Sequence, residues 1–193
     1  MIGPFTLDDQ EAELGYSADG LYGFDTVALG NGSNVSQVKQ VVATIADVEA
    51  YWLGVFGLGP KSINFTTFND PIPSFMSDLV NTSTIPSLSW GYTAGASYRS
   101  KAPASLTLGG YDANRFEPTD FSLSMYEDNS RPLLVAVEKI IAENTIGGTA
   151  AVNLLPSATY HFIDSTVPHI WLPDDAISQF VRASYICVLR ALC

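Results

Sequence analysis

The sequence predicts an all-β fold, and three observations lead to that prediction. Short segments rich in β-branched and aromatic residues recur at spacings of roughly 10 to 20 residues. Turn pairs such as Gly109-Gly110 and Asp128-Asn129 separate them,. Long helical segments do not intervene, which favours a sandwich or barrel over βαβ units. With 47% hydrophobic and 15% charged residues, the 193-residue chain can form one large domain or two small lobes,.

The first half of the chain contains three predicted strands and one predicted helix. The strands are expected in GLYGFDTVALGNG, VKQVVATIA and LGVFGLGP, at residues 20–32, 38–46 and 53–60,. Residues 72–85 carry apolar side chains at helical spacing, and Ser74 is a suitable N-cap,. An alternating aromatic set is expected in the core: Tyr22, Phe24, Trp52 and Phe56,.

The second half continues with further strands and ends in a predicted helix. Four segments are expected to be strands: PSLSWGY at 86–92, SLTLGGYD at 105–112, FSLSMYED at 121–128 and LLVAVEKIIA at 133–142,. Residues 174–193 have helical periodicity,. After Phe180 the composition changes, and both cysteines, Cys187 and Cys193, lie in the last seven residues.

Charge and composition exclude several classes of partner. Nine basic and twenty acidic residues give a net charge of −11, which disfavours nucleic acid and anionic membranes,. No apolar run reaches the roughly 18 residues of a membrane span. The first sixteen residues are acidic and do not resemble a signal peptide,. Two cysteines indicate neither a disulfide framework nor a zinc site, so we expect no metal and no cofactor,.

Four Asn-x-Ser/Thr sequons indicate a secreted glycoprotein. They begin at Asn31, Asn34, Asn64 and Asn81,. The alternative is that these stretches are polar turns rich in Asn, Gly and Ser.

Asp164 is the one acid in the otherwise apolar stretch FIDSTVPHIWLP, residues 162–173. Burying a carboxylate requires partners for its charge, so this position indicates a specific role. His161 and His169 flank it, which raises the alternative of a hydrolase with Ser165 as nucleophile. The chain has no Gly-x-Ser-x-Gly motif, and both histidines fit strand-edge positions better,.

Five stretches, taken in order, resemble the pepsin-like aspartic protease family, in particular its divergent fungal secreted members. The resemblance covers about residues 13 to 181. The matching stretches are GLYGFDTVALG at 20–30, GVFGLGP at 54–60, SFMSDLVNTSTIPSLSWGY at 74–92, SLTLGGYDANRF at 105–116 and FIDSTVPHIWLP at 162–173.

The resemblance implies a bilobal acid protease fold that hydrolyses peptide bonds with a water held between two aspartates, one from each lobe. It implies that Asp164 is the second-lobe aspartate and that Ser165 is a supporting hydroxyl. It also implies a peptide or protein substrate in the inter-lobe cleft, no cofactor, secretion, and a monomer when complete.

The chain departs from the family pattern at the first aspartate. The early acids have no apolar-Asp-Thr-Gly context: Asp8, Asp9, Glu11 and Glu13. Family spacing places Glu13 where the flap tyrosine belongs, and Tyr16 takes that role only in a shorter hairpin. Asp25, in an Asp-Thr dipeptide, matches a structural position of the flap strand.

The second motif departs as well. Thr166 replaces the family glycine, and Val167 and then Pro168 follow where a hydroxyl would support the aspartate. A valine cannot donate that hydrogen bond, which is worth roughly 1.5 to 3 kcal/mol.

These comparisons predict the following organisation. Residues 1–93 are the remnant of the first lobe with its flap hairpin, and 94–104 are an inter-lobe linker. Residues 105–193 are a partial second lobe, with a divergent tail from about residue 182. A chain that lacks strands at both ends should expose apolar faces and strand edges.

Three functions remain open at this stage. The family activity is that of an aspartic endopeptidase, and this chain by itself is expected to be inactive. The alternatives are a secreted pseudoprotease that binds peptides without cleaving them, and a structural secreted glycoprotein.

Overall fold

The structure is a computed structural model that describes residues 3–4, 19–30, 35–46, 53–65, 70–96, 98–128, 131–143, 148, 150–166 and 170–183. The chain forms two compact units, Met1–Phe121 and Ser122–Cys193. The regular elements among the described residues are mainly strands of open antiparallel sheets, together with two α-helices. The all-β class predicted from the sequence is therefore confirmed.

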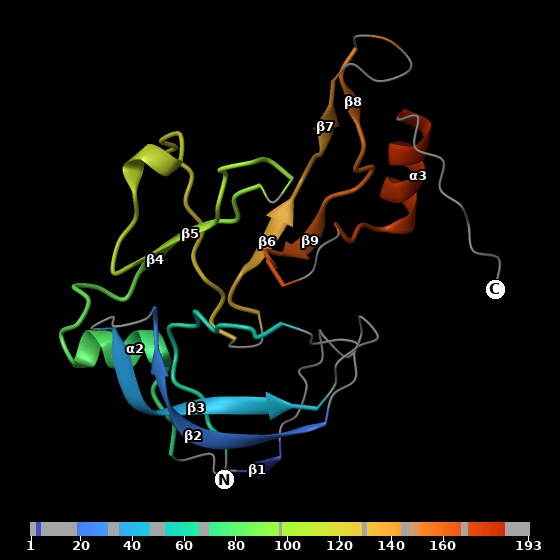
Figure 1. Cartoon of the computed structure of the whole chain (residues 1–193). Coiled ribbons are helices and arrows are strands. Elements are labelled where there is room, and N and C mark those ends of the chain that lie inside the picture. Colours follow the sequence, from blue (N-terminus) through green and yellow to red (C-terminus); the bar gives the residue numbers. More distant parts are fainter. Residues whose placement is uncertain are drawn as a thin grey trace. The chain divides into compact units, whose positions relative to one another are not determined.

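The first unit contains a three-stranded antiparallel sheet in the order β1-β2-β3 (Figure 1). Its strands are β1 (Gly3–Pro4), β2 (Gly20–Ala28) and β3 (Ser36–Ile45). The alternating, β-branched sequences of β2 and β3 favour this extended pairing, and both predicted strands are confirmed,.

A β-bulge interrupts the pairing of β2 with β3. Asp25 lies opposite Gln40, whereas Val27 lies opposite Gln37, so β3 contains one extra residue at this point,. Lys39 takes up the irregularity with a φ of 57°, in the left-handed region,. Because of the extra residue, two glutamines three positions apart are both buried instead of alternating between the two faces,.

Helix α2 (Phe75–Asn81) begins at the predicted N-cap. The hydroxyl of Ser74 accepts a hydrogen bond from the Ser77 N–H at 3.2 Å, which satisfies one of the unpaired amides of the first turn,. At the other end, the Thr82 hydroxyl donates to the Asp78 carbonyl at 2.8 Å. The predicted helix and its cap are confirmed.

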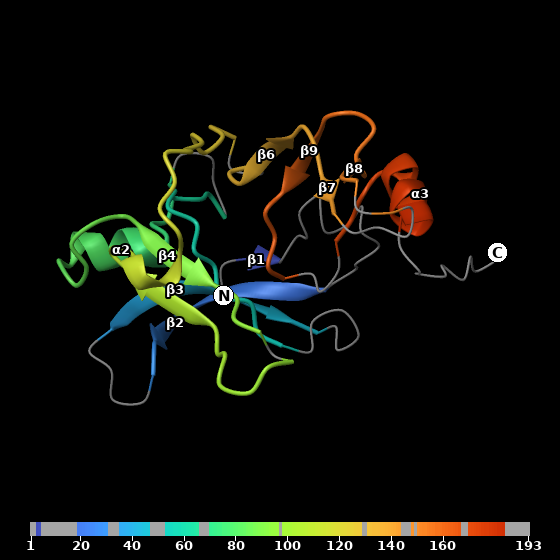
Figure 2. The same ribbon diagram turned by 90° about the horizontal axis from the view of Figure 1, so that it is seen from above.

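The two buried glutamines of β3 connect the sheet to α2. Gln37 Nε2 donates to Thr82 Oγ1 at 2.9 Å, and Gln40 Nε2 donates to Asp78 Oδ2. Figures 1 and 2 show α2 lying where β3 begins. The helix is therefore anchored by hydrogen bonds at its middle residue, Asp78, and at its C-cap, Thr82,.

The core of the first unit lies around α2. Four buried residues form it, and partly buried residues of β2, β4 and β5 pack against them. The four are Phe75, Met76, Leu79 and Ile85.

An antiparallel hairpin of β4 (Trp90–Thr93) and β5 (Ser105–Leu108) completes the described part of the first unit, together with the short 3-10 helix η1 (Ala113–Arg115). Trp90 and Leu108 pack against the core around α2. Residues 94–104 were expected to link two lobes. They instead connect β4 and β5, which pair with each other within the first unit. The boundary between the two units lies after Phe121.

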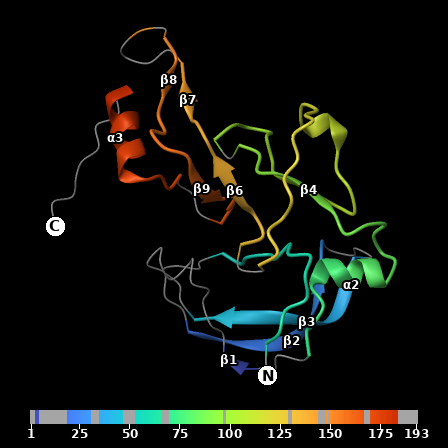
Figure 3. The ribbon, with the colours of Figure 1, turned by 180° about the vertical axis from the view of Figure 1, so that it is seen from behind.

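The described residues of the second unit form two small antiparallel sheets and a helix (Figure 3). Strand β6 (Leu134–Val137) pairs with β9 (Thr159–Phe162), and β7 (Ile141–Ala142) pairs with β8 (Val152–Asn153) between them in the sequence. Helix α3 (Asp174–Ala183) follows, at the start of the predicted C-terminal helix.

Two strand predictions are wrong. Residues 53–60 and 121–128 are irregular in the structure. A strand exists only where a neighbour pairs with its backbone groups, and no described segment pairs with these stretches,. Glycines punctuate the first stretch, and the apolar side chains of the second, such as Phe121 at 72%, are exposed.

The predicted aromatic core is also wrong in part. Phe24 and Phe56 are exposed, whereas Tyr22 is half-buried with its ring 4.9 Å from that of Phe65. Trp52 lies outside the described residues. Alternation of residue types along a strand indicates which side chains share a face of the sheet. It does not indicate which face other segments of the chain will bury.

The predicted exposure of apolar side chains is confirmed. Large apolar residues are exposed in both units, among them Tyr98 and Ile170, each at 83%. Exposure on this scale promotes association of the chain with itself or with other proteins.

A double-mutant cycle tests the bond between β3 and α2. We expect the cycle of Gln40→Ala with Asp78→Ala to give a coupling energy of about 2 kcal/mol, because the bond is charge-assisted and part-buried,. Urea denaturation followed by circular dichroism measures each variant. Exposed Ser36, on the same strand, supplies the control Ser36→Ala, which should not couple to Asp78→Ala. A Gln40–Asp78 coupling as small as that of the control would contradict this assignment.

Candidate functional site

The predicted second-lobe aspartate lies just beyond the end of strand β9. The β6–β9 pairing runs from Val137 opposite Thr159 to Leu134 opposite Phe162. One further backbone hydrogen bond, from the Ile163 N–H to the Leu133 carbonyl at 3.0 Å, extends the ladder. Asp164 is the next residue, where the strand pairing stops.

The carboxylate of Asp164 closes a tight local turn. Its Oδ1 accepts two hydrogen bonds from Thr166, one from the backbone N–H and one from the hydroxyl, both at 2.7 Å. Bonding of an aspartate to the amide two residues ahead is an Asx-turn, a common way to end a strand. The side chain is exposed, so the apolar neighbours in the sequence impose no burial on its charge,.

Thr166 supplies the hydroxyl that the family pattern places further along the loop. The sequence comparison treated Thr166 only as the replacement of a glycine, and it placed the hydroxyl that bonds the carboxylate at the position of Val167. Ser165 was expected as a supporting hydroxyl that reaches the loop of the other lobe. In the structure Ser165 is exposed and makes no hydrogen bond with Asp164. The signal for Thr166 was present in the sequence, because Asp-x-Thr is a spacing that allows both bonds of the turn. Val167 and Pro168 lie outside the described residues.

His161 belongs to β9 opposite Val135, which agrees with the predicted strand position. Its Nε2 is buried and has no hydrogen-bond partner in the described part of the chain. In a serine hydrolase, a ring nitrogen of the histidine accepts the proton of the nucleophilic serine. The structure shows no hydrogen bond between the Ser165 hydroxyl and Nε2 of His161. His169 is not among the described residues.

Asp25 makes a local contact comparable to that of Asp164. It lies in β2 opposite Gln40, it is exposed, and its Oδ1 accepts a hydrogen bond from the Thr26 N–H at 2.7 Å. This contact fits the structural role predicted for it.

No second carboxyl group shares a hydrogen bond with Asp164 among the described residues. Glu13, the other early acids and Tyr16 fall outside them. The same described ranges hold no group of three or more His, Cys, Asp or Glu side chains that could bind a metal ion. None of the helices described is long and apolar enough to cross a bilayer.

Two of the four sequons can be located. Asn64 is exposed in a loop, and Asn81 is exposed as the last residue of α2. Asn31 and Asn34 are outside the described ranges. Glycosylation of any of the four stays a prediction.

Comparisons with known proteins give no assignment: no family model and no curated protein sequence matches this chain.

Substitutions of Thr166 measure how much its hydroxyl contributes to stability, apart from the contribution of its backbone N–H. We expect Thr166→Val to lower the free energy of unfolding by about 1 kcal/mol, because it removes one hydrogen bond to the Asp164 carboxylate,. Thr166→Ser keeps a hydroxyl and should stay close to the parent chain. Urea denaturation of the three proteins gives the comparison. A Thr166→Val protein as stable as the parent chain would show that the hydroxyl contributes nothing.

Proposed function

We propose that this chain is part of a bilobal, pepsin-like aspartic endopeptidase and carries the second-lobe aspartate, Asp164. The observation that carries the proposal is the ordered series of five matching stretches, from GLYGFDTVALG at 20–30 to FIDSTVPHIWLP at 162–173. Each stretch alone is short, and their common order gives the resemblance its weight.

Features of the local structure support the proposal. The first stretch coincides with β2, the third contains α2 and β4, and the fourth begins with β5. Asp164 projects from the end of a strand, with one carboxylate oxygen, Oδ2, that accepts no hydrogen bond from described residues. An oxygen in that position is accessible to a water or a substrate.

The same proposal makes this chain inactive as a protease by itself. The family reaction requires one carboxylate to accept a proton from water while another donates to the peptide carbonyl. The 193 residues contain no Asp-Thr-Gly or Asp-Ser-Gly triplet. This chain therefore does not contain the triplet that, in the family, carries the second catalytic aspartate to pair with Asp164.

One observation favours the alternative of a pseudoprotease that binds peptides without cleaving them. Oδ1 of Asp164 is already occupied by both donors of Thr166. A carboxylate used in this way stabilises a turn whether or not it takes part in proton transfer. In either form, the proposed partner is an extended peptide or protein and the proposed location is extracellular.

A digestion assay tests whether the chain by itself cleaves peptide bonds. The substrate is haemoglobin or casein at about pH 3 to 4, the range in which two carboxyl groups that share a proton are active. We expect no cleavage that pepstatin, an inhibitor of the family, suppresses. Pepstatin-sensitive cleavage that is lost in Asp164→Asn but kept in Asp25→Asn would show that the chain is active. The two substitutions are matched, because both remove the charge of an exposed aspartate whose carboxylate accepts a hydrogen bond from a nearby backbone amide.

The transcript upstream of the Met1 codon tests the family assignment. An in-frame segment encoding apolar-Asp-Thr-Gly supports an aspartic endopeptidase. A complete message without it, combined with saturable binding of an extended apolar peptide, supports the pseudoprotease. If the complete message lacks this segment and the protein binds no peptide, both the endopeptidase and the pseudoprotease proposals are contradicted.

A further inference from the structure

Strand β6 has one edge with which no described strand pairs. It pairs with β9 on its other side, in a two-stranded sheet. The Ile163 N–H bonds to the Leu133 carbonyl, so in this antiparallel register the odd-numbered residues of β6 direct their backbone groups to β9,. Leu134 and Ala136 therefore direct their N–H and C=O groups to the opposite edge. A strand edge of this kind is a template for pairing with another extended segment.

The chain just before β6 already makes the first contact along this edge. The Tyr126 N–H donates to the Pro132 carbonyl at 3.3 Å. Pro132 precedes Leu134 by two residues, so its carbonyl faces the same edge. It has no N–H with which to return the bond, so this pair has one hydrogen bond instead of two. The contact fixes a register in which Ser124 is the next residue opposite Leu134.

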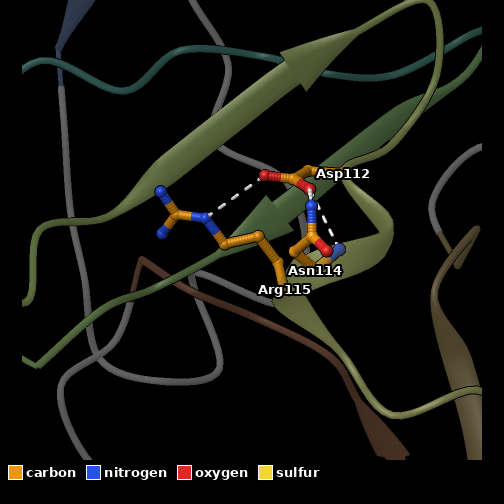
Figure 4. Close-up of polar contacts among 3 residues, drawn as sticks. All are labelled: Asp112, Asn114 and Arg115. Atoms are coloured by element: carbon orange, nitrogen blue, oxygen red, sulfur yellow. Dashed lines mark hydrogen bonds and ion pairs between the residues drawn. The ribbon is translucent and has the colours of Figure 1, made fainter.

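Local contacts close the turn between these two segments. The Arg131 N–H donates to the Asp128 carbonyl at 3.0 Å, and Oδ2 of Asp128 lies 3.6 Å from Nε of Arg131. Asp112 and Arg115, also three residues apart, make the same two contacts at the same distances in the first unit (Figure 4). The recurrence indicates that an aspartate followed three residues later by an arginine closes such a turn by itself.

The side chains of residues 122–126 suit this register. Directly opposed residues of antiparallel strands project from the same face of the sheet. Leu123 would therefore lie beside Val135, and Met125 beside Leu133. Leu123 and Met125 are exposed, at 55% and 45%, whereas Val135 and Leu133 are half-buried. Pairing in this register thus brings apolar side chains together on one face and leaves the serines of the segment on the other.

We infer that residues 122–126 are a strap that docks on the open edge of β6 as a third strand of the β6–β9 sheet. In the structure the strap is undocked beyond its first hydrogen bond. Docking pairs Ser124 with Leu134 and Ser122 with Ala136 through reciprocal backbone hydrogen bonds. It covers an edge that otherwise pairs with other chains. All of these residues lie in the second unit, and the inference is independent of the proposed protease relationship.

The strap of the same chain is favoured over a second copy as the occupant of this edge. A short turn joins the strap to β6, and a short connection gives an effective concentration on the order of millimolar. Docking gives up one bond, because the Leu134 N–H donates to the Arg131 carbonyl at 3.3 Å in the undocked form. That N–H gains the Ser124 carbonyl in exchange, and the burial of apolar side chains adds to the gain.

A disulfide trap in the full chain tests the docked register. Leu123→Cys and Val135→Cys are combined in a background with Cys187→Ser and Cys193→Ser. Opposed residues that exchange no hydrogen bonds have Cα atoms about 4.5 Å apart, a distance that a disulfide spans. The matched control replaces Leu123→Cys by Ser124→Cys, whose side chain would point to the opposite face. In a glutathione redox buffer we expect about tenfold more intramolecular disulfide than in the control, because Cβ atoms that point apart cannot be bridged.

Two outcomes of the trap overturn the inference. Equal disulfide formation in the two variants would mean that the strap has no preferred register on β6. Disulfides between chains, seen as dimers on a non-reducing gel, would assign the edge to a second copy. The trapped chain should also associate with itself more slowly in light scattering than the same chain after reduction, because the edge is covered. Equal rates of association would overturn the protective role.

Hydrogen exchange of the ¹⁵N-labelled parent chain gives a decision even if the cysteine variants do not fold. In the docked strap the N–H groups of Ser122 and Ser124 point to β6, and those of Leu123 and Met125 point to solvent. After correction for intrinsic rates, we expect the two serine amides to exchange about tenfold more slowly than the other two. Equal exchange of all four amides would show that the strap does not dock.

Discussion

The bulge at Lys39 is the constraint on which the first unit depends. A regular β3 would point Gln37 and Gln40 to opposite faces, because residues three apart in a strand have opposite orientations. The extra residue, accommodated by a left-handed Lys39, brings both amides to α2. The strained backbone of one residue is offset by two part-buried hydrogen bonds that set the position of the helix,.

The position of α2 in turn determines which face of the β4–β5 hairpin is covered. Trp90 and Leu108 pack into the cluster around the helix, and the Trp90 indole donates to the Leu58 carbonyl at 3.1 Å. Glycine-rich residues 53–60 are thereby held without forming a strand. The other face of the hairpin, with its threonines and serine, borders an open hollow that Tyr111 and Phe116 also line.

The described part of the second unit shows no comparable anchor. Its sheets have two strands each, and a two-stranded sheet alone is marginally stable in water,. The buried apolar residues in its described part are Leu154, Leu155 and Ala176. Asp164 consequently lies at the exposed end of a small sheet, where its carboxylate is stabilised by its own loop rather than by an enclosed site. Catalysis by a carboxylate pair requires the partner and the water exclusion that a complete cleft supplies.

Local sequence patterns were sufficient to predict several individual helices and strands. Helix α2 with its Ser74 cap, the β2 and β3 strands, and the start of α3 follow from periodicity and capping, which act over a few residues. The resemblance likewise singled out Asp164 at the end of a strand. The pattern also predicted strands at 53–60 and 121–128, and there it was wrong, because a strand needs a paired partner that local sequence does not reveal,.

Other features depend on contacts between distant segments and became visible in the folded chain. It showed the bulge at Lys39, the exposure of Phe24 and Phe56, and the hydrogen bonds that Thr166 donates to Asp164. It also brought Thr93 and Tyr111 together around one open hollow, from segments separated in the sequence. The physical reason is the same in each case: burial and hydrogen-bond partners depend on contacts between distant segments, and a one-dimensional pattern does not contain them.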